Sequence, residues 1–98
     1  MSAYRVEFAS AAVRAFEELP RGTRARIRRR LEQLARAAAI PGQRHGKAVK
    51  TIRGRADSFY RLRVGDYRVM YDVLHEDRVI LVLGIVHRGE LERWLRNR

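Results

Sequence analysis

The sequence predicts an α+β fold in which a small, twisted and mainly antiparallel sheet of about four strands carries an N-terminal helical hairpin. Three observations support this fold class. Residues 3–8 alternate between apolar and polar side chains, residues 9–39 carry apolar side chains at helical spacing, and two strand-like segments flank Gly65-Asp66. The predicted order of elements is β-α-α-β-β-β-α, in a single domain spanning residues 1–98.

The helical hairpin is predicted from two segments. Residues 9–20 carry apolar side chains at helical spacing and end at Pro20, which cannot continue a helix. A longer helix is predicted from about Thr23 to about Ala39, with an apolar stripe that should pack against the first helix. The stripe consists of Ile27, Leu31, Leu34 and Ala38, and the other side carries Arg24, Arg26, Arg28, Arg29, Arg30 and Arg36.

The remaining strands belong to the second half of the chain. Residues 40–57 contain Pro41 and several glycines, so we expect an irregular stretch there. Strands are predicted at about residues 58–64, 67–74 and 78–86. The last of these is apolar at almost every position, which predicts burial on both faces and a central place in the sheet. Residues 88–98 predict a short, basic terminal helix.

The segment FYRLRVGDYRVMYDV, residues 59–73, predicts a hairpin with a two-residue turn at Gly65-Asp66. In this register Arg63 lies opposite Arg68, and Arg61 lies diagonal to that pair, on one face of the hairpin. Like charges opposite each other destabilise a sheet, so an anion bound there would relieve the repulsion. The other face carries Tyr60, Leu62, Val64, Tyr67, Val69 and Tyr71, with Val64 opposite Tyr67, Leu62 opposite Val69 and Tyr60 opposite Tyr71.

The composition indicates the kind of partner. The chain has 22 Lys and Arg against 11 Asp and Glu, a formal net charge of +11, which favours nucleic acid, a ribonucleoprotein or an acidic protein as partner. Cysteine is absent, which excludes disulfides and cysteine-based metal sites. We expect a soluble, cytoplasmic protein without membrane contact, because no apolar run approaches a membrane span and the N-terminus lacks a leader pattern.

The second half of the chain also resembles a known family. Residues 47–54 read K-x-x-K-x-I-x-G, and YRLR, GDYRVMY and a terminal HR follow along the chain. Together with the order of elements, these motifs resemble the RelE/ParE superfamily of type II toxins. The resemblance implies a RelE-like fold and a toxin held inactive by an antitoxin. RelE-like members cut messenger RNA, usually in the ribosomal A site, whereas ParE-like members bind DNA gyrase.

RNA cleavage of the kind that the resemblance implies uses the ribose 2′-hydroxyl as nucleophile and needs no metal. It requires a base, an acid and stabilisation of the charge that builds on the phosphoryl oxygens. Arginine suits the last role, because its planar fork matches phosphate oxygens. The resemblance implies that Arg61, Arg63 and Arg68 serve the scissile phosphate, and that Arg88 matches a phosphate-stabilising arginine.

The proton-transfer role has one candidate near the hairpin. Arginine does not act as a base, whereas the ordinary pKa of His87 lies near working pH. RelE-like members of the YoeB kind carry a histidine with such a role at this place. If the last strand stays regular through residue 88, only one of His87 and Arg88 points to the face that carries Arg68.

Three further residues are candidates for RNA contact. Trp94 stands where many RelE-like members have a tyrosine, and indole can stack on a base but cannot serve as an acid. Packing of the terminal helix onto the sheet is the commoner role for such a tryptophan. Lys47 and Lys50 border the site in relatives. His45 and His75 are expected in a loop and a turn, and three scattered histidines without cysteine predict no metal site and no cofactor.

We therefore predict a RelE-like endoribonuclease toxin that cleaves messenger RNA on the ribosome and is inhibited by a cognate antitoxin with an acidic segment or helix. The alternative is a ParE-like gyrase inhibitor without nuclease activity. A third hypothesis is a member of the superfamily that has lost toxicity and binds only its antitoxin. The predicted catalytic residues are His87, Arg68, Arg61, Arg63 and Arg88, and the predicted RNA-binding residues are Lys47, Lys50 and Trp94.

Overall fold

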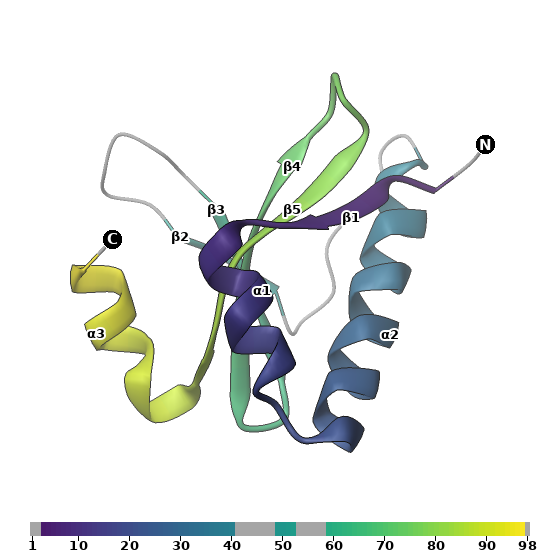
Figure 1. The fold of residues 1–98 in the computed structure, drawn as a ribbon. Coiled ribbons are helices and arrows are strands. Elements are labelled where there is room, and N and C mark those ends of the chain that lie inside the picture. The colour runs from purple at the N-terminus through teal and green to yellow at the C-terminus, as the bar shows by residue number, and fades with distance from the viewer. Residues whose placement is uncertain (1–2, 41–48, 53–58, 98) are drawn as a thin grey trace.

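The computed structural model describes residues 3–40, 49–52 and 59–97, and its ribbon is drawn in Figure 1. The element order is β-α-α-β-β-β-β-α with a short 3₁₀ turn, η1, before the last helix. The elements are β1 (Arg5–Phe8), α1 (Ser10–Glu17), α2 (Arg21–Ala38), β2 (Val49–Ile52), β3 (Phe59–Val64), β4 (Tyr67–Leu74), β5 (Val79–His87), η1 (Arg88–Glu90) and α3 (Leu91–Arg96).

The predicted fold class is confirmed, with one strand beyond the predicted order. The irregular structure expected over residues 40–57 is wrong for residues 49–52, which form β2 and pair antiparallel with β3. A four-residue strand is too short to show a clear hydrophobic period in the sequence. β2 forms because its backbone pairs with β3, a contact that the local sequence does not predict. Of the rest of that stretch, residues 41–48 and 53–57 lie outside the described residues.

The strands form one sheet in the order β1-β5-β4-β3-β2. β1 runs parallel to β5, and the other three pairs are antiparallel. β5 has a neighbour on each side, as its unbroken apolar sequence predicts. The pairing of β4 with β5 shifts between Met70 and Tyr71, where Met70 lies opposite Gly84 and Tyr71 opposite Val82. Leu83 is therefore an extra residue in a β-bulge.

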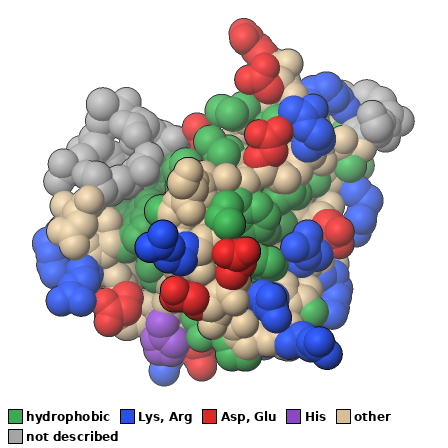
Figure 2. All heavy atoms as spheres, viewed as in Figure 1, with side chains coloured by type: hydrophobic (Ala, Val, Ile, Leu, Met, Phe, Trp, Pro, Cys, Tyr) green, Lys and Arg blue, Asp and Glu red, His purple; other side chains and the backbone are tan. Residues whose placement is uncertain are grey.

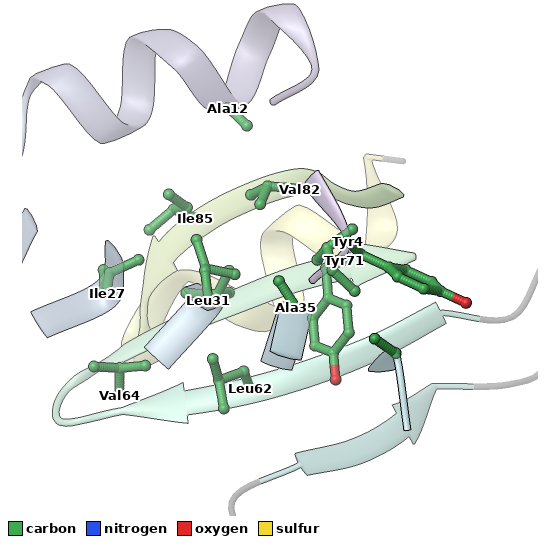
Figure 3. Close-up of a cluster of buried hydrophobic side chains, with 13 residues drawn as sticks. Tyr4, Ala12, Ile27, Leu31, Ala35, Leu62, Val64, Tyr71, Val82 and Ile85 are labelled. Carbon is green, nitrogen blue, oxygen red and sulfur yellow. The ribbon is translucent and has the colours of Figure 1, made fainter. Parts of the chain in front are cut away.

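The larger core lies between the sheet and the two N-terminal helices. Ile27, Leu31 and Ala35 of α2 and Ala12 of α1 are buried against it, as Figure 3 shows. The apolar face predicted for the hairpin belongs to this core, which confirms the predicted alternation. Its sheet residues are Leu62, Val64, Val69, Tyr71, Ile80, Val82 and Ile85.

A second, smaller core lies on the opposite face of the sheet, under α3. Leu91 and Trp94 of this helix pack against Phe59 and Met70, so the terminal helix covers the sheet face from which the hairpin arginines project. Gly84 is buried there and allows close contact, since a methyl group on it would lie 2.5 Å from Trp94 Nε1. No helix among the described residues is long and apolar enough to cross a membrane.

Candidate functional site

The hairpin formed by β3 and β4 has the predicted register. Arg63 lies opposite Arg68, and Val64, Leu62 and Tyr60 lie opposite Tyr67, Val69 and Tyr71. Gly65 opens the turn with a φ of 57°, a conformation that glycine adopts without strain. Glycine with positive φ in the first turn position is typical of a type II′ turn, whose twist suits an antiparallel pair. The arginines therefore project from a rigid, paired segment.

Four arginines gather on one face at the turn end of the hairpin, and we refer to Arg61, Arg63, Arg68 and Arg88 as the arginine cluster. Two contacts position Arg88 beside the hairpin. Its backbone N–H donates to the carbonyl oxygen of Asp66 at 2.7 Å, and its Nε lies 3.7 Å from Asp66 Oδ1. Because the two side chains are 65% and 68% exposed, this ion pair leaves most of the Arg88 charge available.

Arg68 is the most constrained member of the cluster. Its Nη1 donates to the carbonyl oxygens of Gly65 at 3.1 Å and Tyr67 at 3.0 Å, which holds the guanidinium against the turn. Partial burial lowers the pKa of Arg68, and the positive charges of Arg61, Arg63 and Arg88 lower it further, while Asp66 acts in the opposite direction. Arg68 remains charged, and the part of the lowering that comes from the three arginines reflects a positive field that a bound anion would offset.

His87 lies on the other side of the sheet from the cluster. It is opposite Tyr67 in the pairing of β4 with β5, and the two rings meet edge to face with centroids 5.6 Å apart. Of the two residues at the end of β5, Arg88 therefore lies with the hairpin arginines. His87 faces the side of the sheet that carries α1 and α2.

The β-bulge explains this placement. Ile80 and Val82 face the larger core, and with regular alternation residue 87 would face the arginine cluster. The extra residue at Leu83 reverses the alternation, so that Ile85 faces the larger core and Val86 faces α3. His87, two residues after Ile85, therefore faces the same side of the sheet as Ile85.

His87 also caps η1. Its Nδ1 accepts a hydrogen bond from the backbone N–H of Gly89 at 3.2 Å. A neutral imidazole that accepts at Nδ1 carries its proton on Nε2. In this conformation the exposed His87 ring therefore offers Nε2–H as a donor.

The predicted RNA-binding residues fall in different surroundings. Trp94 packs within the second core, with its ring 5.8 Å from that of Phe59 in an edge-to-face contact, which is the packing role expected for it. The backbone of Lys50 pairs with Arg61, which places β2 next to the cluster. Lys47 and His45 lie outside the described residues. His75 lies in the turn between β4 and β5, as expected, and accepts or donates a hydrogen bond with the Tyr4 hydroxyl at 3.0 Å.

Sequence reasoning missed two contributors to the site. Asp66 was recognised only as a turn residue, although its carbonyl and carboxylate both hold Arg88. Arg26 of α2 lies against Gly65 at the tip of the hairpin, with Nη1 3.2 Å from the position of a methyl group on that glycine. No local pattern signals the second contact, because it depends on how α2 docks on the sheet. Among the described residues, no group of three or more His, Asp or Glu could hold a metal ion.

Comparison with known proteins supports the family that these features indicate. Residues 6–92 match the family described as the ParE toxin of the type II toxin-antitoxin system parDE. The chain belongs to the RelE/ParE family of type II toxins. The toxin is similar to RelE1 of Methanocaldococcus jannaschii, with 29% identity over 85 residues that cover 87% of this chain and 90% of that protein.

Two solved structures extend the comparison. The archaeal RelE–RelB complex from Pyrococcus horikoshii contains a chain 31% identical to the toxin, with a TM-score of 0.68 over 90% of this chain and 98% of that one. The toxin-antitoxin complex RelBE2 from Mycobacterium tuberculosis contains one that is 24% identical, with a TM-score of 0.71 over 91% of this chain and 95% of that one. The second likeness shows the shared fold, and the first adds sequence similarity to a toxin crystallised with its antitoxin.

Proposed function

We propose that this toxin is a RelE-like endoribonuclease that cleaves messenger RNA on the ribosome by attack of the ribose 2′-hydroxyl on the adjacent phosphodiester. The observation that carries the proposal is the arginine cluster. Arg61, Arg63 and Arg68 share one face of the hairpin, and Asp66 holds Arg88 beside them. Partial burial lowers the pKa of Arg68, and the charges of the other three arginines lower it further. Like charges held side by side repel each other, so a bound anion would stabilise this arrangement, and perturbed pKa values of this kind cluster at functional sites.

The cluster would act on the phosphoryl oxygens. In the reaction the 2′-oxygen bonds to phosphorus and the bond to the 5′-oxygen breaks, which leaves a cyclic phosphate and a 5′-hydroxyl end. Negative charge grows on the non-bridging oxygens before that bond breaks, and preorganised guanidinium groups stabilise it more than they stabilise the bound substrate. Arg68, fixed against the turn, would be the principal group, with Arg61, Arg63 and Arg88 completing the cradle.

His87 is our candidate for proton transfer, and its position sets a specific requirement. Because Nδ1 accepts from Gly89 and Nε2 carries the proton, the ring can accept a proton only after the cap bond opens. Arg88 directly follows His87, so a phosphate drawn to Arg88 would pull on η1, the element that this cap holds. RNA binding would in this way free the His87 ring from its cap. Because the ring faces the opposite side of the sheet from the cluster, proton transfer at a phosphate held there would also require the freed ring to turn around the end of β5.

Lys47, Lys50 and Trp94 remain proposed RNA contacts. Support differs among them. The pairing of Lys50 with Arg61 brings β2 to the border of the cluster, whereas Trp94 packs against Phe59 and would at most present one edge of its ring to a base.

A cognate antitoxin is the proposed protein partner. The relatives in the archaeal complexes were crystallised with RelB, and the toxin carries a net charge of +11. An acidic segment or helix would neutralise this surface and compete with RNA for the arginines.

The decisive experiment is primer extension on a defined messenger RNA. The purified toxin is added to a reconstituted translation reaction and, separately, to the same RNA without ribosomes. We expect cuts within the translated region only in the first reaction. Absence of cuts in both reactions would contradict the proposal and leave the arginine cluster as a docking surface.

Inhibition of DNA gyrase is the second candidate, since the matched family is described by its ParE toxins. Induction of the toxin in cells separates the two activities. RNA cleavage predicts rapid arrest of protein synthesis, whereas gyrase inhibition predicts filamentation with DNA damage while protein synthesis continues.

A further inference from the structure

The arginines of α2 divide between two flanks of the helix. Residues four apart lie one turn apart on the same side, so Arg26 and Arg30 share a flank. This flank faces the hairpin, because Arg26 contacts Gly65 at its tip. Arg28 and Arg36 lie on the opposite flank, where they line a hollow of about 380 Å³ between α2 and β1.

The flank with Arg26 and Arg30 continues the arginine cluster around the hairpin tip. Arg26 lies against Gly65, and the next residue, Asp66, holds Arg88 of the cluster. A strand bound at the cluster would therefore meet Arg26 as soon as it passed the turn. The hairpin tip is the short bridge between the two basic surfaces.

The charges of this flank are not neutralised within the described part of the chain. The three ion pairs found there are Arg5–Glu7, Arg88–Asp66 and Arg93–Glu90, and none includes an arginine of α2. The acidic residue within α2, Glu32, lines the hollow on the other flank. Figure 2 shows Arg side chains along α2, at the right and lower right of the view.

The surface suits a phosphate backbone better than a folded protein partner. Partner helices and strands are anchored by exposed apolar side chains. Among the described residues, the large apolar side chains that are exposed are Val13, which belongs to α1, and Ile40, which lies beyond the C-terminal end of α2. Arg26 and Arg30 are about 6 Å apart along the helix axis, a separation close to that of successive phosphates on one strand.

We propose that the flank of α2 bearing Arg26 and Arg30 is a second RNA-binding surface. It holds the phosphates of the strand that leaves the arginine cluster around the hairpin tip. The inference rests on the proposed function, because it takes the strand at the cluster to be RNA. It adds the direction in which that strand runs and two residues that hold it.

The test compares two double variants of equal charge. Arg26→Gln/Arg30→Gln removes the proposed contacts, and Arg28→Gln/Arg36→Gln removes the same charge from the opposite flank of the same helix. The probe is a fluorescent single-stranded RNA in which every sugar is 2′-O-methylated, so that binding is measured without cleavage. Dissociation constants are determined between 50 and about 300 mM salt, and circular dichroism checks that each variant is folded.

We expect the Arg26/Arg30 variant to bind more weakly, with the slope of log K against log salt reduced by about 1.4, the loss of two single-strand phosphate contacts. The control variant should keep the slope of the unmodified toxin. Equal weakening by both variants would overturn the inference, because net charge alone would then explain the binding. Weakening toward poly-L-glutamate but not toward RNA would overturn it as well, and would assign the flank to an acidic protein.

The result separates this inference from the proposed function. If the unmodified toxin binds the RNA with the predicted dependence on Arg26 and Arg30 but cuts no message, the endoribonuclease activity fails and the binding surface stands. If it cuts message and neither variant changes RNA affinity, the activity stands and the second surface is wrong.

Discussion

Arg68 is both charged and fixed in position. Its guanidinium is held in place by two carbonyl oxygens of its own turn. Rigid charge is the form of charge that stabilises a transition state, because no reorganisation is needed when the reaction begins. In the proposed reaction the neighbouring arginines would add to this effect, because a bound anion would offset the repulsion among them that Asp66 only partly offsets.

The Arg68→Ala variant should lose both binding and rate. We expect RNA cleavage in the translation reaction to fall by about 10²- to 10³-fold, in line with the loss of one oxyanion-stabilising donor. Arg68→Lys should recover charge but not the planar fork, so its rate should remain well below that of the unmodified toxin. Arg36→Ala is the matched control, because Arg36 is exposed on the far flank of α2. Full activity of Arg68→Ala would exclude the arginine cluster as the catalytic surface.

His87 has a structural role and a proposed chemical role, which two substitutions separate. His87→Ala removes both the imidazole ring and the acceptor for Gly89, whereas His87→Asn keeps an acceptor that caps well and removes only the group proposed to transfer a proton. We expect both variants to lose about 10²-fold or more in cleavage rate while they stay folded and bind RNA. Normal cleavage by His87→Asn would show that the ring acts as a cap alone.

The packing of the terminal helix α3 requires a glycine at position 84 of the sheet. Trp94 lies over Gly84 so closely that even a methyl group would overlap with the indole. The contact holds α3 on the same face of the sheet as the arginine cluster, with Met70 and Phe59 beneath it. Two features far apart in the sequence, a glycine in β5 and the tryptophan of α3, thus determine how much of that face is covered.

Gly84→Ala should loosen α3. We expect a destabilisation of about 1–3 kcal/mol from overpacking and a red shift in fluorescence, which reports Trp94 directly because the chain has 1 tryptophan. Gly22→Ala in α2 is the control, since nothing lies within 4 Å of the added methyl group and alanine suits a helix better. Denaturant unfolding followed by fluorescence gives both quantities. An unchanged spectrum and unchanged stability of Gly84→Ala would show that the contact with Trp94 is not tight.

The two cores stabilise opposite faces of one sheet, and Tyr71 lies at the centre of the larger one. Its ring is fully buried and stacks on Tyr60 with centroids 5.4 Å apart. Burial raises the pKa of Tyr71, and the neighbouring Tyr60 phenol raises it further. The folded state resists ionisation of this phenol and the unfolded state does not. The contribution of Tyr71 to the free energy of unfolding is therefore complete below about pH 10 and is lost as the pH rises above that value.

Alkaline unfolding measures this effect on the entire molecule. We expect the melting temperature to fall steeply between about pH 9.5 and 11.5, and to fall less in Tyr71→Phe, which has no phenol to ionise. Circular dichroism melts at closely spaced pH values provide the comparison. Parallel pH profiles for the two proteins would mean that Tyr71 does not contribute to the alkaline loss.

Local patterns were enough to predict the arginine face of the hairpin. Alternation, together with a glycine that accepts positive φ at residue 65, determines the register of β3 and β4, and the register determines which side chains share a face. The helical hairpin and the interior place of β5 follow from hydrophobic period in the same way. Each of these features depends on residues close together in the chain.

Three features of the site were decided only by the tertiary structure. An unbroken run of apolar residues hides the bulge at Leu83, yet that bulge sends His87 to one side of the sheet and leaves Arg88 with the cluster. The short strand β2 forms by pairing with β3. Arg26 reaches the hairpin tip only because α2 docks on the sheet. The physical reason is common to all three: each rests on contacts between segments distant in the chain, whose free energy no local sequence pattern encodes.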